Sequence, residues 1–242
     1  MNQPLAAPRL VELADRCLTQ SRRLRAPLYI LMALALLAAF LYAPTEREMG
    51  IYQRIFYFHV GAAWNAFLAF FLVGAAGVAY LRSRRLLWDQ FAASAVEVGL
   101  LFTTIVLTTG PIWARPAWGT WFPWGDPRLM TTLVLGLMYV AYLILRSSLP
   151  EGHKRYRFAA VFGIICFMNV PIVYKSIDWW RTLHPKVITA SGEGLETRMW
   201  HTLWMALAAF SLLLFALVLL RCSMRLNQLA ADELQLNAQE MR

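Results

Sequence analysis

Six long apolar runs, separated by shorter polar or proline-containing segments, dominate the pattern of this 242-residue chain. Each run is close to the roughly 17–25 residues that an α-helix needs to cross a bilayer. The pattern therefore predicts an all-α integral membrane protein with six transmembrane helices. We expect a single polytopic membrane domain over residues 1–242, with spans at about 26–43, 55–80, 91–113, 129–145, 158–174 and 199–220.

The first apolar run allows two interpretations, an uncleaved membrane anchor or a cleaved signal peptide. Its length of about 18 residues exceeds the usual core of about 7–15 residues in a signal peptide, and no small-x-small cleavage pattern precedes APTER (43–47). We therefore expect an anchor. The preceding stretch RLVELADRCL (9–18) has apolar residues at helical spacing and is expected to lie along the inner membrane surface. The polar carboxyl-terminal tail is expected to be helical.

Composition and charge agree with a membrane protein and add an orientation. Hydrophobic residues make up 59% of the chain and charged residues 15%, whereas a typical soluble domain has about 25% charged residues. Fifteen of the 23 Lys and Arg residues lie in the two terminal segments and in alternate loops. The positive-inside rule then predicts that both termini are cytoplasmic. This asymmetry also explains the net charge of +9 without a nucleic-acid partner.

Several common kinds of site lack their sequence signals. The three cysteines, Cys17, Cys166 and Cys222, form no C-x-x-C pair, so neither a disulfide framework nor a thiol-exchange site is indicated. The chain has no zinc-ligand spacing such as H-E-x-x-H, and no G-x-S-x-G, Walker A or G-x-G-x-x-G motif. We therefore expect neither a nucleotide site nor a hydrolase nucleophile, and we predict that the protein is not an enzyme.

Tryptophan collects on the membrane face opposite the termini. Eight of the ten tryptophans lie in the outer loops or within about two helical turns of them, above all in WGTWFPWGDPRLM (118–130). An interfacial aromatic belt is the alternative interpretation, but a belt decorates both faces of the membrane. We therefore predict a binding surface on this face, formed by a tryptophan-rich outer loop (114–128) and a second histidine-bearing loop (175–198).

Three of the four histidines, His59, His184 and His201, are predicted on the same face, and His153 lies in a basic cytoplasmic loop. His59 shares its helix face with small alanines, which leave a flat shelf for a planar group. His184 follows two tryptophans and precedes a proline, which tends to fix the local backbone. Two imidazoles beside aromatic surface suit a large flat ligand with a coordinating metal at its centre, and haem is such a ligand. The alternative for each histidine is a structural polar residue near the membrane interface.

Cations near these histidines are candidate partners for the two propionates of a haem. Arginine offers the better bidentate geometry for a carboxylate. Each of these cations has the alternative interpretation of a solvated loop charge near lipid headgroups. The four candidates are Arg115, Arg128, Arg181 and Lys186.

One carboxylate, Glu97, lies within a predicted span, about two turns from its cytoplasmic end. An intramembrane carboxylate is a functional candidate by default. Three alternatives remain open for Glu97: a protonated side chain, a bond to a neighbouring helix, and contact with a partner subunit.

Three segments carry a family resemblance: RIFYFHVGAAW (54–64), WGTWFPWGDPRL (118–129) and NVPIVYKSIDWWRTLHP (169–185). They look like the first histidine segment, the tryptophan-rich WWD signature and the second histidine segment of the haem exporter protein C (CcmC) family of cytochrome c maturation. The resemblance extends over nearly the whole chain. The three segments in this order, in a six-span chain of this length, are strongly specific.

The resemblance implies that haem b is held as transient cargo at the outer, periplasmic face of the inner (cytoplasmic) membrane. It implies that His59 and His184 are the axial ligands of the haem iron. The implied partners are the periplasmic haem chaperone CcmE, which takes the haem covalently, the ABC transporter pair CcmA and CcmB, and the small subunit CcmD. The tryptophan-rich haem platform of the family corresponds here to Trp118, Gly119, Trp121, Trp124, Asp126 and Arg128.

The chain departs from the family signature at three positions. Phe122 replaces a tryptophan and loses its indole N–H donor, Gly125 lengthens the spacing before Asp126, and Met130 replaces a threonine. Because glycine permits backbone angles that other residues avoid, the orientation of Asp126 is the feature most affected.

Three other functions compete with haem presentation. Cytochrome c synthetases of the same superfamily (CcsA or CcmF) are generally longer and have additional spans and histidines. A b-type cytochrome that carries electrons across the bilayer needs histidine pairs inside facing helices, and no predicted span has a deeply placed histidine. A haem-free permease associated with an ABC transporter is disfavoured because no broken spans occur in matched halves of the chain.

Overall fold

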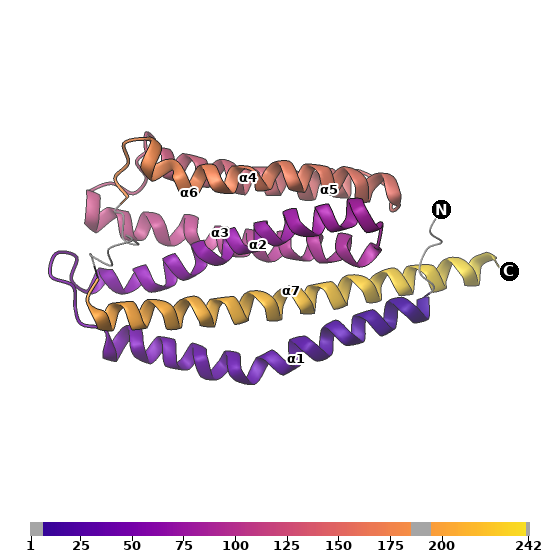
Figure 1. Cartoon of the computed structure of the whole chain (residues 1–242), viewed down its shortest axis with the longest axis horizontal. Helices are drawn as coiled ribbons and strands as arrows, with labels where there is room; N and C mark the ends of the chain where they lie inside the picture. Colours follow the sequence, from indigo (N-terminus) through magenta and orange to yellow (C-terminus); the bar gives the residue numbers. More distant parts are fainter. Residues whose placement is uncertain (1–6, 185–194, 241–242) are drawn as a thin grey trace.

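The computed structural model describes residues 7–184 and 195–240, and this part of the chain contains helices and no β-strand. Figure 1 shows long helices that run roughly parallel to one another. Six helical segments are long and apolar enough to cross a membrane, which confirms the prediction of an all-α membrane protein with six spans. The elements are α1 (Ala7–Leu37), which continues as the π-helix η1 (Ala38–Tyr42), the 3-10 turn η2 (Ile51–Gln53), α2 (Arg54–Ser83), α3 (Leu86–Trp118), α4 (Pro127–Ser147), α5 (His153–Phe167), α6 (Asn169–Trp179) and α7 (Thr197–Glu240).

The helices form three layers, α1 with α7, α2 with α3, and α4 with α5 and α6 (Figure 1). Helix α1 begins and helix α7 ends at the same end of the bundle, which we call the tail end. The loops 119–126 and 180–184 lie at the opposite end, which we call the loop end.

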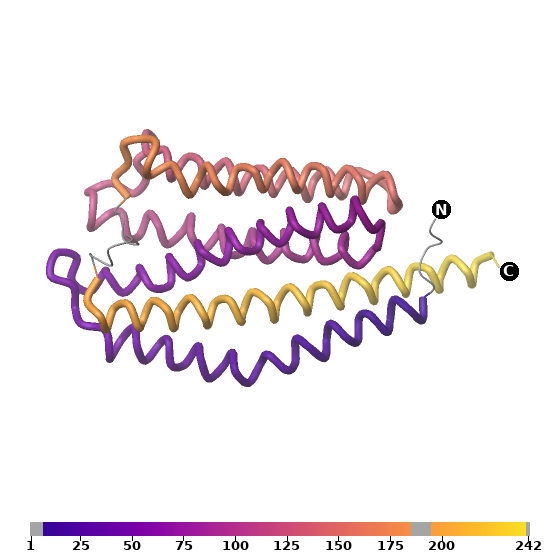
Figure 2. Tube along the Cα trace, in the orientation of Figure 1, coloured from indigo at the N-terminus to yellow at the C-terminus, as the bar shows by residue number. Residues whose placement is uncertain are grey.

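Helix α1 runs without interruption from Ala7 into the first span. Leu10 and Ala14 are buried against Cys222 and Leu226 of α7, so the expectation of a separate surface helix at 9–18 is wrong. The apolar residues of this stretch face another helix instead of the membrane surface. The 44 residues of α7 measure about 66 Å at 1.5 Å per residue, and Figure 2 shows α1 lying beside α7 along much of this length. The helical carboxyl-terminal tail is confirmed.

Helix α5 approaches α2 closely because glycines lie at the contact. A Cβ atom on Gly77 of α2 would lie 2.9 Å from the carbonyl oxygen of Ala160 in α5. A Cβ atom on Gly163 of α5 would lie 3.0 Å from Val73 of α2. Side chains at these glycines would force the two helices apart.

The fifth apolar run is broken at Met168, where α5 ends and α6 begins. Pro171 explains the break, because it has no N–H to donate to the carbonyl oxygen of Phe167 and its ring disfavours a continuous helix. Helix α2 contacts α5 extensively but contacts α6 only marginally. The break therefore separates the loop-end half of this span from α2.

Two groups of ion pairs join helices toward the tail end. Asp89 of α3 and Arg146 of α4 form a bidentate pair with both N–O distances at 2.5 Å and both side chains at most 3% exposed. Glu97 of α3 accepts hydrogen bonds from Arg221, at 2.6 Å, and from Arg225, both in α7. Of the alternatives for Glu97, the bond to a neighbouring helix is therefore confirmed.

Candidate functional site

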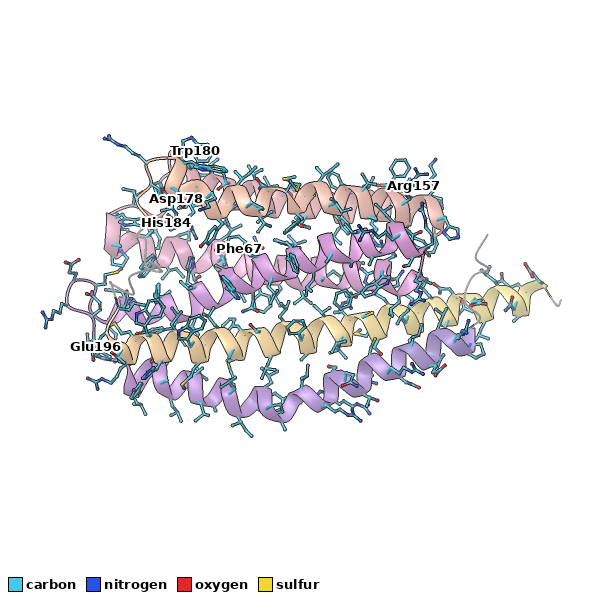
Figure 3. The ribbon with its side chains drawn as sticks, in the orientation of Figure 1. Phe67, Arg157, Asp178, Trp180, His184 and Glu196 are labelled. Carbon is cyan, nitrogen blue, oxygen red and sulfur yellow. The ribbon has the colours of Figure 1, made fainter. Side chains whose placement is uncertain are left out.

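A cavity of about 430 Å³ lies at the loop end, between α2 and α3 on one side and α4 and α6 on the other. Its volume falls within the range of about 300–1,000 Å³ that is common for ligand pockets. Figure 3 shows Asp178 and His184 toward the loop end and Phe67 deeper in the bundle, and all three line the cavity. Four of the predicted site residues line this cavity, namely His59, Trp118, Arg128 and His184.

His59 lies near the start of α2, and its hydrogen bond defines which ring nitrogen is free. Its Nδ1 atom is 2.9 Å from Oγ1 of Thr109 in α3. Thr109 donates its one hydroxyl hydrogen to the carbonyl oxygen of Ile105, at 2.7 Å, so its oxygen accepts from Nδ1–H of His59. In a neutral imidazole the Nε2 atom of His59 then carries the lone pair, which is the form in which an imidazole binds a metal.

A continuous series of aromatic contacts connects the two histidines. The His59 ring stacks on Trp113 with centroids 6.2 Å apart, and Trp113 contacts Trp118 edge-on at 6.0 Å. Trp118 in turn contacts His184 edge-on at 5.1 Å. Trp113 is only 6% exposed, so this part of the series is buried in the protein and is not an interfacial belt.

Asp126 joins the start of α4 to the segment that carries His184. Its Oδ1 atom accepts from the backbone N–H groups of Arg128 and Leu129, at 3.0 and 3.2 Å, and so caps α4. Its Oδ2 atom accepts from the Thr182 hydroxyl at 2.7 Å and from the Leu183 N–H at 2.8 Å. The side chain is 1% exposed. Burial opposes ionisation, but these hydrogen bonds hold the pKa of Asp126 below its usual value.

His184 is held neutral by its surroundings. Burial, and after it the positive charge of Arg128, lower the pKa of His184 to about 4, and the Asp126 carboxylate opposes this shift without overcoming it. Its Nδ1 atom lies 3.4 Å from Oδ1 of Asp126. That distance is longer than the range of about 2.7–3.2 Å for an N–H···O bond, and the buried Nδ1 atom has no hydrogen-bond partner within the described residues. At neutral pH His184 therefore has a lone pair for a ligand.

Of the three predicted cations within the described residues, Arg128 lines the cavity. Its buried Nη1 atom has no hydrogen-bond partner among residues 7–184 and 195–240. A buried guanidinium nitrogen of this kind is suited to an acidic group of a ligand. Arg115 instead donates to the carbonyl oxygen of Gly119, and Arg181 is exposed. Lys186 lies outside the described residues, as do the other residues of 185–194 in the predicted loop 175–198.

The tryptophan-rich loop is shorter than predicted. Helix α3 continues to Trp118, five residues beyond the predicted end of the third span, so the loop covers 119–126 and not 114–128. The prolines Pro111 and Pro116 lie inside this helix and made an earlier end the natural prediction. Gly119 ends α3 in the left-handed region, with φ of +73°, where glycine is favoured.

The remaining aromatic residues of the loop divide between the cavity and the surface. Trp121 and Trp124 are 58% and 70% exposed and are not among the cavity-lining residues. Phe122, the position that departs from the family signature, lines the cavity and contacts Trp124 with ring centroids 4.7 Å apart. The loop therefore presents one ring to the cavity and two to the exterior.

Two residues that contact His59 were not in the predicted site. Thr109 and Trp113 lie four residues apart on one face of α3, and both contact His59, but only Trp113 also lines the cavity. Neither has a sequence signal that relates it to His59, which precedes Thr109 by 50 residues. His201, by contrast, lies outside the cavity lining, and its Nδ1 atom is 3.1 Å from the Tyr42 hydroxyl.

The donor set does not suit a bare metal ion. Within the described residues, no group of three or more His, Cys, Asp or Glu side chains could hold a metal ion. Two neutral imidazoles in an apolar cavity suit a metal that brings its other ligands in a flat ring, with the imidazoles in the axial positions.

Comparison with known proteins identifies similar chains. Residues 2–237 match the family model described as "Heme exporter protein C". The protein of that name from Bradyrhizobium diazoefficiens is 34% identical over 196 residues, which cover 80% of this chain and 74% of the relative. The protein of the same name from Escherichia coli (strain K12) is 33% identical over 181 residues, which cover 74% of this chain and 73% of the relative. The protein of the same name from Rhodobacter capsulatus is 30% identical over 188 residues, which cover 75% of this chain and 76% of the relative.

Proposed function

The chain belongs to the haem exporter protein C family, and from this membership we propose that it binds haem b as transient cargo in the loop-end cavity. His59 and His184 are the axial ligands of the iron, each through Nε2. The observation that carries this proposal is that two imidazoles line the same cavity and are connected by Trp113 and Trp118. Flat aromatic walls favour a planar ligand over a compact one.

The residues around the two histidines complete the site. Thr109 orients His59 by accepting from Nδ1–H, and Asp126 holds the backbone that carries His184. Residues that hydrogen-bond to a metal-binding histidine set the orientation of its ring and the strength with which it binds the metal. Arg128 pairs with a haem propionate through the guanidinium nitrogen that has no other partner among the described residues.

The side of the membrane follows from the positive charges. The protein crosses the inner membrane with both termini cytoplasmic, because Lys and Arg are concentrated on that side. The loop end then faces the periplasm, where the exposed rings of Trp121 and Trp124 form a contact surface for the haem chaperone CcmE. The protein works in an ABC-type complex with CcmA, CcmB and CcmD.

The protein delivers haem and does not catalyse its attachment. Coordinate bonds to two imidazoles are reversible, so haem leaves when the chaperone offers a competing site. The covalent bond to haem forms on CcmE.

Mixing haem-loaded protein with haem-free CcmE in detergent tests this function. We expect about one haem per chain before mixing and transfer to CcmE afterwards. The double variant Trp121→Ala/Trp124→Ala is expected to keep its haem and to transfer it at least 10-fold more slowly, because both rings lie outside the cavity lining. Ile112→Ala is the matched control, since Ile112 is a 51% exposed apolar residue of α3. Protein that never acquires haem, or transfer at the wild-type rate from the double variant, would contradict the proposal.

Asp126→Asn tests the positioning of His184. Asparagine still caps α4 through its carbonyl oxygen, but its NH2 group cannot accept the bonds from Thr182 and Leu183. We expect haem affinity to fall by about 10–100-fold, the usual effect of losing a hydrogen-bonding residue that positions a metal ligand. Haem titration of the purified variant measures the change. Thr182→Val removes one of the two bonds to Asp126 and also the hydroxyl that accepts from the His184 N–H at 3.2 Å, so its haem affinity should fall as well. Unchanged affinity in Asp126→Asn would refute this role.

A further inference from the structure

The cavity extends far below the loop end. Phe67, which lines its deep part, is thirteen residues after the start of α2 at Arg54, or about 20 Å along the helix at 1.5 Å per residue. Thr103 of α3 lines the same depth. The cavity therefore reaches well into the apolar part of the bundle, where the neighbouring medium is lipid.

Beneath this depth the bundle is densely filled. Phe70 and Tyr139 stack with ring centroids 3.7 Å apart, and both are fully buried. Phe102 is 1% exposed beside them, and a Cβ atom on Gly99 would lie 2.6 Å from the Phe70 ring. A large planar molecule could pass from the tail end only by displacing these rings.

The side of the cavity, in contrast, is open. Trp64 of α2, Tyr174 of α6 and Trp204 of α7 all line the cavity, yet they are 51%, 55% and 62% exposed. We call these three residues the aromatic portal. They belong to segments that are long and apolar enough to cross a membrane, and we infer that their exposed surfaces face lipid. The break at Pro171, which separates α6 from α2, accounts for the opening at this level.

The polar groups of the cavity are arranged for an amphiphile that comes from the membrane. The charged and imidazole side chains that line the cavity at the loop end are His59, Arg128, Asp178 and His184. Oδ2 of Asp178 lies 3.3 Å from Nζ of Lys175. The portal side chains are aromatic. A flat apolar molecule with acidic groups at one edge could slide in from lipid with that edge directed toward Arg128.

From this arrangement we propose that haem enters the cavity sideways, through the aromatic portal, from the outer leaflet of the bilayer. The proposal rests on the proposed function, because it takes haem as the cargo. It makes the portal an entrance that is separate both from the coordinating histidines and from the loop-end surface where haem is handed to the chaperone. The packed rings of Phe70 and Tyr139 keep the site closed toward the tail end.

Chemical blocking of the portal tests this route. Trp64→Cys is made in a chain whose three native cysteines are replaced by alanine, and is labelled in lipid nanodiscs with a bulky aromatic maleimide. Haem is then supplied from donor vesicles, and loading is followed by absorption. We expect labelling before loading to slow haem uptake at least 10-fold, and labelling after loading to leave the haem spectrum unchanged. Tyr174→Cys repeats the test from the opposite wall.

Phe71→Cys is the matched control, because Phe71 lies on the same helix with the same 51% exposure but does not line the cavity. Labelled Phe71→Cys is expected to load at the unlabelled rate. If labelled Trp64→Cys and Tyr174→Cys load as fast as labelled Phe71→Cys, the lateral route is wrong although haem still binds. If the unlabelled wild-type chain takes up no haem from vesicles or solution, both the proposed function and the route are wrong.

Discussion

Replacing either His59 or His184 by alanine is expected to lower haem affinity by at least about 100-fold, because losing even a partner behind a metal ligand costs about 10–100-fold. Each single variant should also change a six-coordinate, low-spin iron spectrum into a five-coordinate one. The double variant should purify without haem. The haem-to-protein ratio and the absorption spectrum of each purified variant measure these effects.

The two single variants have a matched histidine control. His201 is also predicted near the membrane interface, but it contacts Tyr42 and does not line the cavity. His201→Ala should therefore keep the wild-type haem content and spectrum. If His201→Ala removes haem while His59→Ala and His184→Ala retain it, the ligands are wrongly assigned.

Asp89→Asn is expected to lower the free energy of unfolding by about 3–5 kcal/mol, the usual cost of leaving one member of a buried ion pair without its partner. Both side chains of the Asp89–Arg146 pair are at most 3% exposed. The asparagine would leave the Arg146 guanidinium charged in a site lined by Tyr142 and Tyr156. Unfolding in mixed detergent micelles, followed by circular dichroism, measures the change.

Two controls distinguish the cost of leaving Arg146 without its partner from the cost of removing any charged residue. The first is an exposed ion pair, and the second is a double variant of the buried pair. Glu12 and Arg16 of α1 are also 2.6 Å apart, but their side chains are 59% and 71% exposed. Glu12→Gln should change the unfolding free energy by less than about 1 kcal/mol. Asp89→Asn/Arg146→Met should lose less than the sum of the two single losses, because it removes the uncompensated charge. Equal losses for Asp89→Asn and Glu12→Gln would refute the buried-pair account.

The number of membrane spans and their helical structure were predictable because a membrane span must be a long apolar run, whereas the break of the fifth span into α5 and α6 was not predicted. The fourth run, predicted at 129–145, is observed as Pro127–Ser147, since Asp126 and Pro127 give a clear helix start. The same reasoning failed where a helix is stabilised by another helix. The stretch 9–18 has the pattern of a surface helix, and its contact with α7 depends on a segment about 200 residues away in the sequence.

The candidate site was partly predictable for the same kind of reason. His59 and His184 stood out because imidazoles are rare beside apolar runs, and the structure brings both to one cavity. Their role as ligands stays a prediction. The function of Thr109 and the double role of Asp126 could not be predicted, because each depends on which atoms meet across helices. Gly125, which lengthens the signature, leaves Asp126 with four hydrogen bonds, so this departure is compatible with a structural role for the carboxylate.

The most direct test of the central claim is near-infrared magnetic circular dichroism of the haem-loaded wild-type protein in the ferric state, because this spectrum identifies the two axial ligands of the iron. We predict a low-spin iron with two neutral imidazole ligands, one from His59 and one from His184. A high-spin iron, an axial pair other than two histidines, or a protein that holds no haem would contradict the account.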